Sequence, residues 1–299
     1  MPNILVVIDP DESAHSALNR IKEIPPAAAV NYTVVLYLPA LPMMAGKADS
    51  AALKARKDAK IAWLQDLVAP LQAVGYKIQA ETVTFNRLHD EIIKTAQAIN
   101  ADFILKPLRQ HNTLKRVFYT PTDWNLIRLC PTPLILVSDQ PVIHGKAIVA
   151  AIDVGDADKA HQDLNTVVME QATRLAGVLE APLHLVYAYS RLIIANPVPT
   201  ADPLAYQIMR DKYASEHAAV IAVASLYDIP DERVHLREGT AADVVTACAE
   251  EVDAGVVVLG TVARSGASGL FVGNTAESVL ERTKKDVFVV KQASFTTPV

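Results

Sequence analysis

The chain has 299 residues, 51% of them hydrophobic, which is enough for about two domains with sizeable cores. Lys and Arg total 28 against 33 Asp and Glu, a balance that excludes the strongly basic composition of a general nucleic-acid or polyphosphate binder. The composition therefore predicts ordered domains and no nucleic-acid partner.

The sequence also indicates a compartment. Its start, MPNILVVIDPDES, reaches acidic residues after a short apolar run, unlike a signal peptide, and no run approaches the ~20 apolar residues of a spanning helix. Cys130 and Cys248 lie too far apart in the sequence for a close-spaced metal site or a disulfide framework. We expect a soluble, cytoplasmic protein with no membrane span and no bound metal.

The chain repeats itself. ILVVID at 4–9 returns as IVAAID at 148–153, and TVVLYLP at 33–39 returns as LHLVYAY at 183–189. Segments 102–107 and 132–137 match 255–260 and 285–290 at one constant offset. Internal duplication predicts two similar domains, which we place at residues 1–140 and 146–293.

Within each copy, short apolar runs alternate with longer segments of helical period, as in βαβ units. In chain order the first copy predicts strands at 4–9, 32–38, 77–84, 102–106 and 133–138, and helices at about 12–24, 48–74, 87–100 and 121–129. The second copy repeats this order. We therefore expect an α/β fold with two tandem doubly wound parallel sheets, whose ligands bind beyond the carboxyl ends of the strands.

The segment with the most chemical information is VVVLGTVARSGASGLFVGNTAE, from Val256. An apolar strand ends at Gly260, glycines 266 and 269 follow in a loop, and a helix is expected to start around Gly273. Loop glycines permit close approach to a ligand, and amides at a helix start bind anions. The plainer alternative is a glycine-rich turn with an ordinary helix cap.

These features resemble the universal stress protein domain, and the duplication resembles its tandem members. The resemblance implies five-stranded sheets of order 3-2-1-4-5, an adenine nucleotide alpha hydrolase-like fold, and binding of ATP or a related adenine nucleotide in the second copy. The family loop reads Gly, two residues, Gly, nine residues, Gly, then Ser or Thr. Here Gly260 and Gly273 match, whereas Ala263 and Asn274 depart from it, so the nucleotide-binding loop is partial. The candidate nucleotide-binding residues are Asp153, Gly260, Ala263, Arg264, Gly266, Gly269, Gly273, Asn274 and Thr275.

Two of these residues have specific expected roles. Asp153, at the end of a first strand, would bind the adenine or ribose end of the nucleotide, or else cap the next helix. Arg264 could add a bidentate contact to an anion. The loop contains no Lys followed by Ser or Thr, so it is not a Walker phosphate loop, and we expect no catalytic residues and at most weak ATP hydrolysis.

The first copy differs at the matching place. Its segment KPLRQHNTLKRVFYTPTDW, 106–124, contains no glycine, with Pro107 opposite Gly260. We therefore interpret the first domain as degenerate and Asp9 as a relic. Five basic residues there form either a solvated loop, ion pairs with the acidic second copy, or an anion site: Lys106, Arg109, His111, Lys115 and Arg116.

Other functions stay open. Apolar, proline-rich loops at 38–46 and 190–209 favour an apolar or lipid-like ligand held between the domains, and a slow nucleotide hydrolase is a further alternative. The short linker at 139–146 predicts that the two domains pack as a pseudo-symmetric pair. Exposed last strands would also permit a homodimer.

Overall fold

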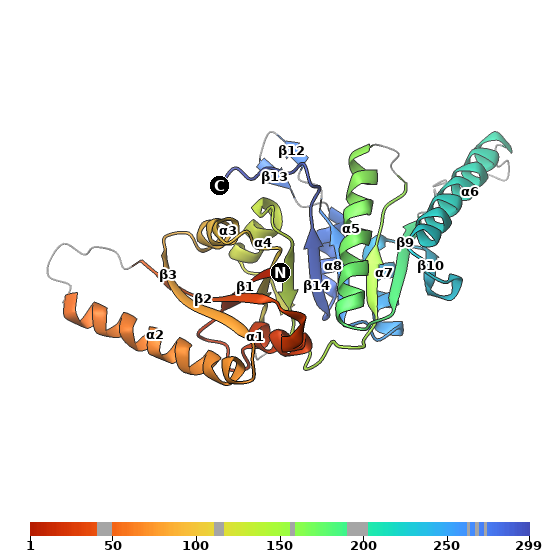
Figure 1. The fold of residues 1–299 in the computed structure, drawn as a ribbon. Coiled ribbons are helices and arrows are strands. Elements are labelled where there is room, and N and C mark those ends of the chain that lie inside the picture. Colours follow the sequence, from red (N-terminus) through yellow and green to blue (C-terminus); the bar gives the residue numbers. More distant parts are fainter. Residues whose placement is uncertain are drawn as a thin grey trace. The chain divides into compact units, whose positions relative to one another are not determined.

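The computed structural model describes residues 1–40, 50–110, 117–155, 159–189, 203–261, 264–266, 269–271 and 274–299 (Figure 1). The chain divides into two compact units, the first formed by residues 1–142 with 296–299 and the second by residues 143–295. In the described part of the chain, no helix has the length and apolar character needed to span a membrane.

The first unit contains one parallel sheet with flanking helices. Its strands are β1 (Asn3–Ile8), β2 (Asn31–Pro39), β3 (Lys77–Phe85), β4 (Phe103–Pro107) and β7 (Leu134–Val137). Its helices are α1 (Ser16–Arg20), α2 (Ser50–Ala73), α3 (Leu88–Ala98) and α4 (Pro121–Leu129), with short 3-10 turns η1 (Ile21–Glu23) and η2 (Pro26–Ala28). The strand order β3-β2-β1-β4-β7 is the expected order 3-2-1-4-5.

The second unit repeats this plan. Its strands are β8 (Ile148–Ala151), β9 (Leu183–Tyr189), β10 (Val234–Glu238), β11 (Val256–Gly260) and β14 (Asp286–Val290). Its helices are α5 (Lys159–Val178), α6 (Pro203–Leu226), α7 (Ala241–Glu251) and α8 (Asn274–Arg282), with the 3-10 turn η3 (Asp231–Arg233). The order β10-β9-β8-β11-β14 again corresponds to 3-2-1-4-5, so the expected fold class is confirmed.

Helices cover both faces of each sheet. Because the crossover connections are right-handed, helices that join strands added in one direction lie on one face, and helices that join strands added in the opposite direction lie on the other face. In the second unit α5 and α6 connect strands in one direction, and α7 and α8 connect strands in the other direction and contact each other. With both faces covered, these strands are mostly apolar and buried: every residue of β11 except Gly260 is buried, and so is every residue of β14, including the polar Asp286.

The first helix and the segments that follow β4 and β11 differ from the sequence expectation. α1 begins only at Ser16, after His15 in a left-handed conformation, and gives way to η1 at Ile21. Two small antiparallel ladders, not predicted from the sequence, lie in the segments that follow β4 and β11: β5 (Arg109–Gln110) with β6 (Val117–Phe118), and β12 (Arg264–Gly266) with β13 (Gly269–Phe271). Both copies therefore carry a hairpin between their fourth strand and the next helix.

Candidate functional site

The order of strands reverses between β8 and β11 in the second unit. The two strands run parallel, with Ala151 beside Leu259, so the residues that follow them leave the sheet side by side. Two predicted site residues, Asp153 and Gly260, therefore lie at neighbouring strand ends. In doubly wound sheets this is the position at which ligands bind.

Asp153 is held in place from both sides of its backbone. Its N–H donates to Oδ1 of Asn165 over 3.1 Å, and its carbonyl accepts from Nδ2 of the same amide over 2.7 Å. One carboxylate oxygen accepts from the N–H of Gly155 at 2.9 Å, in a tight local turn. The side chain is exposed, and its second oxygen accepts no hydrogen bond from the described residues. Asp153 thus presents a fixed, accessible acceptor.

Gly260 has a packing role that the sequence did not show. A Cβ atom built on this residue would lie 2.6 Å from Cγ of Leu164, which is buried on α5. The glycine therefore lets α5 approach the end of β11 closely. The contact accounts for Gly260 without a ligand, so this glycine alone is not evidence of a phosphate site.

The loop leaves β11 at a residue anchored to β14. The N–H of Thr261 donates to the carbonyl of Val290 at 2.9 Å, and Oγ1 of Thr261 accepts from Nζ of Lys291 at 3.0 Å. Both side chains are buried, and the ammonium lies 5.2 Å from the centre of the Phe295 ring. A cationic side chain is thus fixed at the first residue of the glycine-containing segment.

The remaining predicted residues occupy that segment or its end. Arg264, Gly266 and Gly269 lie in the β12–β13 ladder, in which the two glycines face each other, and Asn274 and Thr275 are the first residues of α8. Ala263 and Gly273 lie outside the described residues, as do the side chains of Arg264, Asn274 and Thr275. The structure therefore places a helix start after the hairpin, and the contacts of these nine candidates stay partly a prediction.

Polar groups that the sequence analysis missed adjoin Asp153. A Cβ on Gly155 would lie 3.1 Å from the Tyr187 hydroxyl at the end of β9, 3.3 Å from Asp153 Oδ1 and 3.6 Å from Glu216 Oε1 on α6. Asn165, Tyr187 and Glu216 come from three different elements. Because no short motif links them, only the assembled sheet brings these side chains to one edge.

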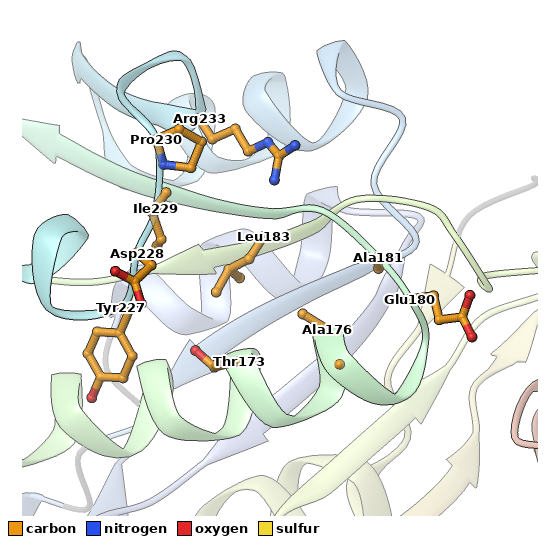
Figure 2. A pocket seen from close by; sticks show the side chains of 11 residues that line it. Thr173, Ala176, Glu180, Ala181, Leu183, Tyr227, Asp228, Ile229, Pro230 and Arg233 are labelled. Carbon is orange, nitrogen blue, oxygen red and sulfur yellow. The ribbon is translucent and has the colours of Figure 1, made fainter.

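A pocket of about 370 Å³ in the second unit lies elsewhere (Figure 2). Its walls come from the end of α5, the start of β9 and the chain around η3, and they include Leu183, Tyr227, Asp228 and Arg233. Since Leu183 begins β9, this pocket lies at the amino ends of the strands. None of the predicted site residues lines it.

In each unit, we use the word corner for the space between the carboxyl end of the fourth strand and the start of the following helix. In the first unit, side chains of the chain itself fill this corner. Pro107 ends β4 as Gly260 ends β11, and each lies beside a valine of the last strand of its sheet. Lys106 was expected in a basic cluster on a solvated loop, in ion pairs with the second copy, or at an anion site. Instead it is buried and its Nζ lies 2.6 Å from Oδ1 of Asp123 in the same unit.

Comparison with known proteins agrees with this architecture. A model of the universal stress protein family matches residues 1–138 and 146–291. The chain is 32% identical to Universal stress protein E of Salmonella typhi and 31% identical to that of Escherichia coli K12, in each case over 312 residues that cover 99% of this chain and 96% of the relative.

Solved structures show the same two-unit fold. A Pseudomonas aeruginosa protein of unknown function has a TM-score of 0.77 at 31% identity, covering 97% of this chain and 92% of that one. A universal stress protein from Archaeoglobus fulgidus has a TM-score of 0.67 at 17% identity, which shows the fold alone. The chain, with one matching domain in each half, therefore belongs to the universal stress protein family.

Proposed function

We propose that this protein is a ligand-binding protein of the stress response whose second unit binds ATP or a related adenine nucleotide at the carboxyl ends of β8 and β11. The observation that carries the proposal is the pairing of these two strands at the reversal of strand order, with Asp153 after one and the glycine-containing segment after the other.

The parts of this edge have complementary roles for a nucleotide. The exposed carboxylate of Asp153 is a fixed acceptor for hydroxyl or amino donors, as a ribose or an adenine provides. The segment that begins at Thr261, next to the Lys291 ammonium, leads to the amino end of α8, where backbone amides favour an anion. The arrangement supports binding without efficient turnover, because the loop sequence lacks the Lys-Ser/Thr pair of hydrolytic phosphate loops.

Titration calorimetry with ATP, ADP and a non-hydrolysable ATP analogue tests this proposal. We expect Asp153→Ala to weaken binding about tenfold or more, because it removes a charged acceptor. Asp163→Ala, which removes an exposed carboxylate on α5 of the same unit, is the matched control and should bind as the wild type does. Equal affinity of all three proteins would contradict a role for Asp153.

A second experiment separates the alternatives. Gly273→Val should abolish nucleotide binding, since a side chain blocks close backbone approach. If Ile193→Asp instead abolishes capture of an apolar ligand and nucleotides do not bind, the lipid-like alternative replaces the proposal. Phosphate release that disappears in the Gly273→Val protein would establish the slow hydrolase.

A further inference from the structure

The first unit contains a buried ion pair at the carboxyl end of β4. Nζ of Lys106 forms an ion pair with Oδ1 of Asp123 at 2.6 Å and donates a hydrogen bond to the carbonyl of Pro107 at 3.1 Å. Lys106 is 7% exposed and Asp123 is 0% exposed. Because a buried charge is strongly unfavourable unless it is paired, each of these side chains depends on the other.

Asp123 also closes the amino end of α4. Its other oxygen, Oδ2, accepts from the N–H of Thr120 at 2.6 Å and from the Thr120 hydroxyl at 2.7 Å, while the N–H of Asp123 donates to Oγ1 of Thr120 at 3.2 Å. This is a capping box joined to a buried ammonium. One carboxylate thus bonds to the N-cap residue of α4 through one oxygen and faces the Lys106 ammonium with the other.

Few backbone N–H donors at the amino end of α4 remain available to an anion from solution. Pro121, the first residue of α4, has no N–H, and the N–H of Asp123, the third, is already bonded to Thr120. Two of the first three residues of α4 therefore offer no backbone N–H to an anion. Lys106, the cation that would attract a phosphate, is already paired with Asp123.

The second unit has neither member of this pair. The ladders of the two sheets correspond: Lys106 and Pro107 lie beside Leu136 and Val137, as Leu259 and Gly260 lie beside Val289 and Val290. The helices α4 and α8 are both nine residues long, and each starts the same number of residues after its strand, β4 or β11, ends.

Given that correspondence, the positions of Lys106 and Asp123 are taken in the second unit by Leu259 and Ala276, both buried and apolar. The two corners therefore share their backbone plan and differ in whether the chain supplies its own anion.

We propose that the Asp123 carboxylate is a built-in anion, which occupies in the first unit the corner where a phosphate group would bind and so blocks that unit against phosphate ligands. The comparison with a bound phosphate rests on the function proposed for the second unit. The blocking contact itself rests on the first unit alone.

Removal of the carboxylate should convert the blocked corner into an anion site. In the full-length Asp123→Ala protein, Lys106 keeps its charge and loses its partner, so the Tm should fall by about 10 °C. Inorganic phosphate should then restore the Tm in a saturable manner, and equilibrium dialysis should count one more bound phosphate per chain than in the wild type. Sodium chloride at equal ionic strength controls for general salt effects.

Three further proteins make the test specific. Asp243→Ala removes a carboxylate that, like Asp123, bonds to its N-cap threonine, here Thr240 before α7. Asp243 is exposed and paired with the exposed Arg282 instead of a buried lysine, so this protein should gain no phosphate site. Lys106→Leu with Asp123→Ala recreates the apolar pair of the second unit, and should be stable with no added phosphate site. Asp123→Asn keeps the shape of the side chain and should gain phosphate dependence even if Asp123→Ala does not fold.

Two results would overturn the proposal. One is that neither Asp123 variant gains a saturable phosphate site. The other is that the Asp243→Ala protein, or the double variant, gains the same site as Asp123→Ala. Failure of the second unit to bind nucleotides would leave the phosphate count of the Asp123 variants unchanged, so the two proposals fail separately.

Discussion

At the scale of single residues, a shared motif position need not have a shared purpose. Gly260 matches the first glycine of the family loop, yet the nearest group to its missing side chain is Leu164 of α5. Asp153, in contrast, keeps an exposed carboxylate oxygen after its backbone and its turn are satisfied. Of these two residues, Asp153 is the better probe of ligand binding and Gly260 the better probe of packing.

The packing role of Gly260 leads to a prediction. Gly260→Ala should lower the free energy of unfolding by about 1–3 kcal/mol, because the new methyl group overpacks against Leu164. Gly177→Ala, in α5, is the matched control: apart from its chain neighbours and the backbone of its own helix, a methyl group there would meet no described atom within 4 Å, so the change should be neutral or slightly stabilising. Urea denaturation measures both.

A double-mutant cycle identifies the partner. In a Leu164→Ala background, the added methyl group at position 260 has room, so most of its destabilising effect should disappear. If Gly260→Ala is as destabilising without the leucine as with it, Leu164 is not the group that requires glycine.

At the scale of elements, the repeat predicts the strands and their order because apolar runs of matching length and spacing occur in both copies. The hairpins after β4 and β11 were not predicted, since strands of two or three residues have too little alternation to detect. The Lys106–Asp123 pair was missed for a different reason. A lysine followed by proline and more basic residues is typical of a solvent-exposed loop. Its partner Asp123 reaches it only when α4 packs on the sheet, which the sequence does not show.

A pair of histidines joins β9 to the edge strand β10. Nδ1 of His184 lies 3.0 Å from Nε2 of His235, and the rings stack with centres 5.3 Å apart. Burial lowers the pKa of His184 to about 4, helped by His235 and Arg233, and burial and Arg237 lower the pKa of His235. Glu251, on α7, accepts two hydrogen bonds from Arg237 and raises the pKa of His235. The buried Cys248 thiol lies on the same helix. Burial is the largest effect, so the folded state favours the neutral forms of His184 and His235.

This pair predicts acid-sensitive stability of the second unit. The unfolded chain binds protons near the ordinary histidine pKa of 6.5, before the folded state does, so stability should fall as the pH drops from about 6.5 to 4. We expect His184→Gln to remove about 1 kcal/mol of that loss. Urea titrations at several pH values measure it, with His217→Gln, an exposed histidine on α6, as the control that should keep the wild-type pH dependence.

At the scale of the whole molecule, duplication has given two units with the same strand order and different corners. One corner contains a buried ion pair, and the other has an exposed carboxylate beside a glycine-containing segment. The sequence predicted this asymmetry through the missing glycines of the first copy. It did not predict that a carboxylate would take the vacated place, because that requires Asp123 and Lys106 to meet across a helix and a strand.

The asymmetry predicts a stoichiometry. Native mass spectrometry of the full chain with excess ADP should show one nucleotide per chain, and at ADP concentrations near the wild-type Kd the Asp153→Ala protein should show a clearly lower occupancy. Two nucleotides per wild-type chain would contradict a blocked first unit, whereas none would contradict the nucleotide proposal for the second.

Asp123 also makes the stability of the first unit independent of ligand concentration. Because the chain itself supplies the carboxylate that neutralises Lys106, no bound metabolite is needed for this unit to fold. Under the function proposed for the second unit, that unit alone responds to ligand. A single site gives a hyperbolic dose response, graded over a wide range of ligand concentrations, whereas two coupled sites would permit a sharper one.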